Sequence, residues 1–299
     1  MFTTRLPLRL SCNAGRFRAM TLILEKKVLG PNVKSLILRS PLVAKKSKPG
    51  HFLVLRVSEK GERIPLTIAD ADPERGTVRI VFQEVGKTTK QLGRLEVGEE
   101  VVDLVGPLGQ PSHIQSFGTV AVVAGGVGIA EAYPIARALR TAGNKIITIL
   151  GARNKELLIM VEEIAKVSDE LFMITDDGSN GKKGLVTDSL RELLEKGTTI
   201  DRVIAIGPTI MMKAVSDLTK KYDLPTVVSL NPIMIDATGM CGACRVSVGG
   251  ETKFTCVDGP EFDAHKVDFD QLLARLSLYK DSEHLSDHKC QLENGSSEK

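Results

Sequence analysis

The chain has 299 residues, of which 42% are hydrophobic and 26% charged, and its formal net charge is +3. This is an ordinary globular composition with room for two domains or three small ones. Aromatic residues make up only 4%, tryptophan is absent, and the basic excess lies within residues 1–20, so a nucleic-acid footprint is not indicated. No apolar run reaches the roughly 20 residues of a membrane helix. We therefore expect neither a nucleic-acid nor a membrane partner.

Residues 1–19 are predicted to lie outside the fold. They contain four arginines and no acidic residue, a pattern that resembles an organellar presequence. The alternative is an upstream start codon, with Met20 as the true start. The expected location is the cytoplasm, or a mitochondrion-related organelle if these residues are a presequence.

The next segment, residues 20–114, reads as a series of short strands. Alternating or apolar runs occur at 21–29, 35–40, 51–58 and 77–85, separated by glycine, proline and aspartate. Short strands at this spacing are typical of a small antiparallel β-barrel.

The pattern changes in residues 115–228. Continuous apolar runs at 119–126, 145–152, 171–177 and 202–208 alternate with helical patterns at 129–143, 185–197 and 209–222. Buried strands that alternate with helices predict an α/β domain built on a parallel sheet.

A third, smaller unit is predicted at residues 229–275. Gly249 and Gly250 separate two short polar–apolar runs, which indicates a β-hairpin with a two-residue turn. A helical pattern at 269–280 could close the unit, and the polar residues 276–299 are predicted to be a disordered tail. The expected fold is therefore a barrel, an α/β sheet domain and a small segment with a hairpin.

The strongest chemical signal lies in this third unit. Asp236, Cys241, Cys244 and Cys256 are separated by four, two and eleven residues. This is the spacing of plant-type [2Fe–2S] sites, with aspartate in the first position. A carboxylate carries the same single charge as a thiolate, so the exchange preserves the net charge of the cluster while making one ligand harder.

The residues around these ligands favour iron and leave two alternatives. Gly239 and Gly242 would let the loop backbone approach the sulfurs of a cluster closely. The same cysteines could instead hold a structural zinc ion. Asp236 could also be a bystander, with water or Cys290 as the fourth ligand.

Two further motifs indicate nucleotide binding. Gly125, Gly126 and Gly128 follow a predicted strand and open a helix, where backbone amides can hold a pyrophosphate; close packing is the alternative explanation. The barrel carries a second motif, in which an arginine and a threonine at a strand end could hold a flavin, or simply form an edge strand and a polar turn. Its residues are Arg63, Pro65, Leu66 and Thr67, followed by Gly86, Lys87 and Thr89.

Together these motifs resemble the ferredoxin–NADP⁺ reductase superfamily, and within it the electron-transfer subunits related to that of dihydroorotate dehydrogenase type B. The resemblance covers about residues 21–275. It implies that the barrel motif binds FAD and that the glycine turn binds NAD(H) or NADP(H), with NAD(H) favoured. It also implies that Gly207, Pro208 and Met211 form a Gly-Pro-x-x-Met element near the nicotinamide.

Two departures refine the resemblance. Dihydroorotate-type subunits have a fourth cysteine where this chain has Asp236, whereas the ferredoxin:NADP⁺ oxidoreductase type has aspartate there. Ile206 also replaces the cysteine that usually precedes the Gly-Pro pair. The implied partners are a larger flavin and [4Fe–4S] subunit in a heterodimer, and ferredoxin.

The predicted function follows from the three cofactors. A nicotinamide gives two electrons as a hydride, a [2Fe–2S] cluster accepts one at a time, and a flavin between them converts one mode to the other. We expect an FAD-dependent NAD(P)H oxidoreductase subunit without an acid–base catalytic residue, and electron bifurcation is a further implication of the resemblance. The alternatives are the electron-transfer subunit of dihydroorotate dehydrogenase type B and a non-catalytic redox-sensing module.

Overall fold

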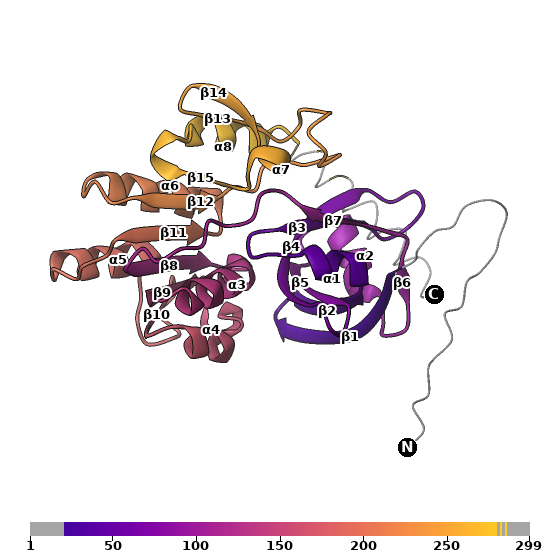
Figure 1. The fold of residues 1–299 in the computed structure, drawn as a ribbon, viewed down its shortest axis with the longest axis horizontal. Coiled ribbons are helices and arrows are strands. Elements are labelled where there is room, and N and C mark those ends of the chain that lie inside the picture. The colour runs from indigo at the N-terminus through magenta and orange to yellow at the C-terminus, as the bar shows by residue number, and fades with distance from the viewer. Residues whose placement is uncertain (1–20, 280–281, 283–284, 286–299) are drawn as a thin grey trace, which may run out of the picture.

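The computed structural model describes residues 21–279 together with residues 282 and 285 (Figure 1). The predicted leader at 1–19, Cys290 and most of the predicted tail lie outside the described residues. A barrel and an α/β domain lie side by side, and a small third unit lies along one edge of the α/β sheet (Figure 1). Within the described part of the chain, none of the helices has the length and apolar character needed to cross a membrane.

The barrel is a near-closed antiparallel sheet, as predicted. Its strands follow the order β6-β1-β2-β5-β4-β3-β7, and their side chains enclose a core that includes Leu36, Leu53 and Phe82. Two short helices, α1 (Pro41–Lys46) and α2 (Lys87–Arg94), complete the unit, so the predicted polar turn at 85–89 is in fact the start of a helix. The strands are β1 (Thr21–Gly30), β2 (Val33–Arg39), β3 (Phe52–Arg56), β4 (Arg63–Asp72), β5 (Thr77–Gln83), β6 (Glu100–Val101) and β7 (Asp103–Leu108).

The second unit is the predicted α/β domain. Its parallel strands follow the order β10-β9-β8-β11-β12. The strands are β8 (Thr119–Gly125), β9 (Lys145–Ala152), β10 (Glu170–Thr175), β11 (Arg202–Ile206) and β12 (Thr226–Ser229); the helices are α3 (Gly128–Thr141), η1 (Lys155–Leu157), α4 (Val161–Val167), α5 (Val186–Glu195) and α6 (Thr209–Lys220). Helices cover both faces of the sheet, as expected when its strands are apolar throughout.

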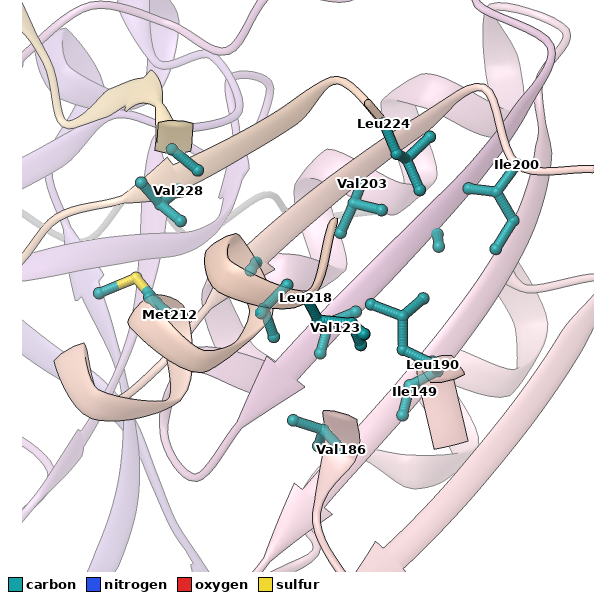
Figure 2. Close-up of a cluster of buried hydrophobic side chains, with 14 of the residues drawn as sticks. Val123, Ile149, Val186, Leu190, Ile200, Val203, Met212, Leu218, Leu224 and Val228 are labelled. Atoms are coloured by element: carbon teal, nitrogen blue, oxygen red, sulfur yellow. The ribbon is translucent and has the colours of Figure 1, made fainter. Parts of the chain in front are cut away.

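The two faces of this sheet form separate hydrophobic cores. Helices α5 and α6 place Leu190 and Leu218 against Val123 and Ile149 of the sheet (Figure 2). On the opposite face, α3 and α4 pack their apolar residues against the strands. Because both faces of the sheet are covered by close-packed hydrophobic side chains, the strand ends are held rigidly enough to position a ligand-binding turn.

The third unit contains the predicted hairpin and extends the α/β sheet. Gly249 and Gly250 have φ values of 62° and 83°, which suit the tight hairpin turn that glycine favours. Strand β15 pairs antiparallel with β12 and becomes the edge strand of the sheet. The elements are β13 (Arg245–Val248), β14 (Glu251–Phe254), α7 (Thr255–Asp258), β15 (Glu261–Asp263), η2 (Ala264–Lys266) and α8 (Phe269–Ser277).

The buried side chain of Asn144 holds the segment that leads into β8 by hydrogen bonds to its backbone. Its Oδ1 accepts hydrogen bonds from the N–H groups of Phe117 at 2.6 Å and Gly118 at 3.2 Å. Its Nδ2 donates to the carbonyls of Gln115 at 2.8 Å and Leu139 at 2.7 Å. We expect Asn144→Ala to lower the free energy of unfolding by about 3 kcal/mol, because buried backbone groups lose their partners. Urea denaturation measures this change.

A graded control is available at Asn154. Its Oδ1 accepts one hydrogen bond, from the N–H of Leu157 at 3.2 Å, at the start of η1. Asn154→Ala should cost about 1 kcal/mol, the usual effect of losing such a cap. Equal losses in the two variants would contradict the role given to Asn144.

Candidate electron-transfer site

The predicted flavin motif occupies the beginning of β4. Arg63 is the exposed first residue of the strand, while Pro65, Leu66 and Thr67 are half-buried. Thr67 lies directly opposite Phe52 of β3 in the antiparallel register, so their side chains share one face of the sheet.

The second predicted flavin segment lies beside the first. Gly86 is extended and Lys87 is the first residue of α2. The Thr89 hydroxyl accepts hydrogen bonds from two preceding backbone N–H groups at 3.1 Å each, so it caps the helix. Thr88 was not predicted as a site residue, yet it is buried and donates to the Glu62 carboxylate at 3.3 Å. This bond joins the start of α2 to the residue that precedes β4.

The two glycine motifs of the α/β domain meet at the carboxyl ends of β8 and β11. A Cβ atom added to Gly125 would lie 2.5 Å from Met211 Sδ and 3.3 Å from Pro208 Cδ. A Cβ atom added to Gly207 would lie 3.0 Å from the Gly125 carbonyl oxygen. Only glycines fit so closely, so the structure brings the predicted Gly-Gly-x-Gly and Gly-Pro-x-x-Met segments together.

The other two glycines of the turn differ in their requirements. Gly126 has a φ of +56°, and a Cβ atom added to it would meet nothing within 4 Å, whereas a Cβ atom on Gly128 would lie 2.6 Å from the Ile206 carbonyl oxygen. Gly126 therefore supplies a left-handed conformation beside open space, and Gly128 supplies the close approach of α3 to β11.

The sequence analysis missed Glu131, which lies between the predicted flavin motif of the barrel and the glycine turn of the α/β domain. Glu131, in the first turn of α3, accepts hydrogen bonds from Thr67 at 3.2 Å and from Ser229 of β12. Burial is the main cause that raises the pKa of Glu131 to about 7; repulsion from Glu261 adds to it, and the two hydroxyl donors oppose it. A carboxylate among the apolar residues of a helix that follows a glycine turn was the available signal.

The predicted cluster ligands lie in and beyond the loop at 231–244. Cys244 and Cys256 are buried, unbridged, and have sulfurs 3.2 Å apart, whereas Cys241 is exposed. Asp236 is half-buried and accepts a hydrogen bond from Thr238. Among residues 21–279, 282 and 285, no three or more Cys, His, Asp or Glu side chains already form a group that could hold a metal ion. The structure thus brings two of the four predicted ligands into contact.

The chemistry of this loop nevertheless fits an iron–sulfur cluster. Two sulfurs on one tetrahedral metal lie roughly 3.8 Å apart for metal–sulfur bonds of about 2.3 Å, a small opening from the 3.2 Å separation of Cys244 and Cys256. Positive φ values of 61° at Ala237, 81° at Gly239 and 67° at Gly242 curl the loop, as in backbone nests that bind anionic groups.

Two buried groups support the same conclusion. The Thr255 hydroxyl is buried beside Cys256 and has no hydrogen-bond partner among the described residues, so it is a donor without an acceptor. Burial and the neighbouring Cys244 thiol raise the pKa of Cys256 to about 12. Thiolates at this position therefore need a cation, which iron would supply.

The cysteines pack directly against the barrel. Cys244 and Cys256 share a small buried cluster with Phe52, Val54 and Ala237. The segment is also fixed to the end of the barrel, where the Gln110 N–H donates to the Gly259 carbonyl at 2.6 Å. Phe52, opposite Thr67, thus separates the predicted flavin strand from the predicted cluster ligands.

A barrel joined to a nucleotide-type sheet and an iron–sulfur segment defines the class. The chain is an electron-transfer subunit of the ferredoxin–NADP⁺ reductase superfamily, in agreement with the family models. Residues 122–217 match the oxidoreductase NAD-binding domain, and residues 231–268 match the iron–sulfur cluster binding domain of dihydroorotate dehydrogenase B. More particularly, the chain belongs to the family of dihydroorotate dehydrogenase B electron-transfer subunits.

Relatives support this assignment over nearly the whole chain. An electron-transfer subunit homolog of dihydroorotate dehydrogenase B (NAD⁺) from Thermotoga maritima is 52% identical over 268 residues, covering 90% of this chain and 94% of the relative. The corresponding subunit from Geobacillus thermodenitrificans is 31% identical, covering 82% and 96% of the two chains.

Solved structures give the same result. A chain of the NADH-dependent reduced ferredoxin-NADP oxidoreductase, solved in a study of flavin-based electron bifurcation, is 49% identical with a TM-score of 0.86 and coverages of 93% and 99%. An Amycolatopsis cytochrome P450 reductase, at 20% identity and a TM-score of 0.57, covers 68% of this chain and 65% of its own and shares the fold alone.

Proposed function

We propose that this chain carries electrons from NADH through FAD to a [2Fe–2S] cluster and then to a partner subunit. The observation that carries the proposal is the position of Phe52, which lies opposite Thr67 in the barrel and packs with Cys244 and Cys256. A flavin against Thr67 would therefore be separated from the cluster by about one side chain. Bound FAD accepts the two electrons of a hydride and releases them singly, as the cluster requires.

The residues of the barrel would hold the flavin. Arg63 at the exposed start of β4 would neutralise its pyrophosphate, and the amide of Lys87 at the start of α2 would donate to it. Gly86, where an added Cβ atom would meet nothing within 4 Å, would leave room for the phosphates. Pro65 would line the ring, and Leu66 would face it with its backbone because its side chain packs against the barrel core. Thr67 would lie against the edge of the ring while its hydroxyl donates to Glu131. Thr89 would keep the α2 turn in place through its capping bonds.

The α/β domain would hold the nicotinamide nucleotide. Gly125, Gly126 and Gly128 would bring the start of α3 to its pyrophosphate. The Gly207-Pro208 turn and Met211 would line the nicotinamide, because they lie against the same glycine turn. The name of the 49% identical relative, an NADH-dependent enzyme, favours NADH over NADPH.

Asp236, Cys241, Cys244 and Cys256 would be the four cluster ligands. Aspartate in place of a fourth cysteine favours a heterodimer with a larger flavin and [4Fe–4S] subunit, in the manner of ferredoxin:NADP⁺ oxidoreductases. The electron-transfer subunit of dihydroorotate dehydrogenase B is the second candidate, because the Thermotoga and Geobacillus relatives carry that name. Affinity purification from the source cell decides between a [4Fe–4S] partner and a dihydroorotate-oxidising one.

The cofactor content of the anaerobically purified chain tests the proposal. We expect one flavin and about two irons per chain, with the absorbance of a [2Fe–2S] cluster. NADH should bleach the flavin and then the cluster. A colourless protein with one zinc would exclude the iron site, and a coloured protein that NADH fails to reduce would favour the redox-sensing alternative.

A further inference from the structure

Glu131 is a half-buried residue whose carboxyl joins three parts of the molecule. From α3 it accepts hydrogen bonds from Thr67 of the barrel, at 3.2 Å, and from Ser229 of β12. Thr67 is half-buried and belongs to the strand to which the flavin is assigned. The inference below therefore rests on the proposed flavin site, and it concerns a residue with no place yet in that site.

The charges around Glu131 make its ionised form costly. Its charged neighbour is Glu261 of β15, which lies opposite Ser229 in the sheet and is itself half-buried, with a hydrogen bond from Ser112. Arg137, further along α3, is engaged by Asp70 at 2.6 Å. Within the described part of the chain, no cation is among the groups that shift the pKa of Glu131. The carboxylate is therefore neutralised most readily by binding a proton.

A hydride adds charge near this carboxyl. It brings two electrons and one proton, so its acceptor gains one net negative charge. A second negative charge one hydroxyl away from Glu131, in a partly buried site, raises the affinity of the carboxylate for a proton. A [2Fe–2S] cluster held by the predicted ligands would accept electrons without protons, so this added charge would be lost when the electrons leave.

We propose that Glu131 takes up one proton when the bound flavin is reduced and releases it when the electrons leave for the cluster. Uptake forms one O–H bond on the carboxyl, and the proton comes from water, so no further reactant is required. The half-buried Thr67 hydroxyl, which contacts Glu131 directly, provides the route. Glu131 acts through Thr67 and through its charge, and is therefore a positioning residue rather than a catalytic one.

The first test needs no cofactor. An acid whose pKa is raised by folding, here from about 4.5 to about 7, makes the native state bind the proton more tightly. The contribution of Glu131 to stability should therefore be fully present below pH 4.5 and be lost as the pH rises to 7. Glu131→Gln keeps the size, and its amide can accept from one hydroxyl and donate to the other. It should flatten this fall in the cofactor-free protein. An unchanged pH profile would overturn the proposal.

The second test measures the flavin equilibrium. Between pH 7 and 9, reduction of the wild type should take up one proton more than reduction of Glu131→Gln. The equilibrium constant against a reference dye should then change an additional tenfold per pH unit, about 30 mV for a two-electron couple. Ser229→Ala, which removes a donor that lowers the pKa of Glu131, should move this window to higher pH.

The outcomes separate this proposal from the proposed function. Equal pH slopes in the wild type and in Glu131→Gln, both loaded with flavin, would overturn the role of Glu131 and leave the flavin site standing. A wild type that binds no flavin would overturn the flavin site itself. Should Glu131→Gln fail to fold, the reduced-minus-oxidised infrared spectrum of the wild type decides: a new protonated carboxyl band supports the proposal, and its absence refutes it.

Discussion

Replacement of Cys244 or Cys256 with serine will remove the visible absorbance of the iron–sulfur cluster while leaving flavin bound. Both sulfurs are buried and 3.2 Å apart, so a serine at either position leaves the iron with a weaker ligand in a closed site. We expect iron content to fall from about two per chain to near zero. Iron analysis and electron paramagnetic resonance of the reduced protein measure the change.

The aspartate ligand allows a sharper experiment. Asp236→Cys should keep the cluster and lower its potential, because a softer thiolate replaces a carboxylate of equal charge. Asp236→Ala should lose most of the cluster. A cluster with unaltered iron content and spectrum in Asp236→Ala would show that Asp236 is not a ligand. Cys290→Ser is the matched control: it should change nothing, and loss of iron would identify Cys290 as the fourth ligand.

Gly128→Ala will abolish nucleotide binding and strongly destabilise the α/β domain. The added methyl group would lie 2.6 Å from the Ile206 carbonyl oxygen and 3.0 Å from Gly207 Cα. Both obstacles are backbone atoms of the central strand and the turn after it, so neither can rotate away. We expect a loss of at least about 3 kcal/mol in the free energy of unfolding, at the upper end for overpacking, and more than a tenfold loss of affinity for NADH.

Gly126→Ala, two residues earlier, is the matched control. Its Cβ atom would meet nothing within 4 Å, and only the φ of +56° opposes it. The cost should be about 1–2 kcal/mol, the penalty for a left-handed alanine. Urea denaturation and calorimetric titration with NADH compare the two variants. A Gly128→Ala protein as stable as Gly126→Ala would contradict the packing given to the glycine turn.

Most of the fold could be predicted from the sequence because it depends on patterns among neighbouring residues. A period of two residues indicated the barrel strands, and continuous apolar runs such as 119–126 indicated buried parallel strands. Segments that depend on their partners were not readable: α2 was predicted as a turn, although Thr89 caps it as a helix. Strand β15 has three residues and exists because β12 offers it an unpaired edge.

The sequence by itself determined which chemical groups the protein offers. These are Asp236 and three cysteines at the spacing of cluster ligands, and glycines where the backbone must be approached closely. These are properties of neighbours along the chain. Only the tertiary structure decided that Phe52 lies between Thr67 and the cysteines and that Glu131 lies half-buried where the barrel meets the α/β domain. Such contacts join residues tens or hundreds of positions apart, and burial, which sets the pKa of Glu131, arises only when the domains close around it.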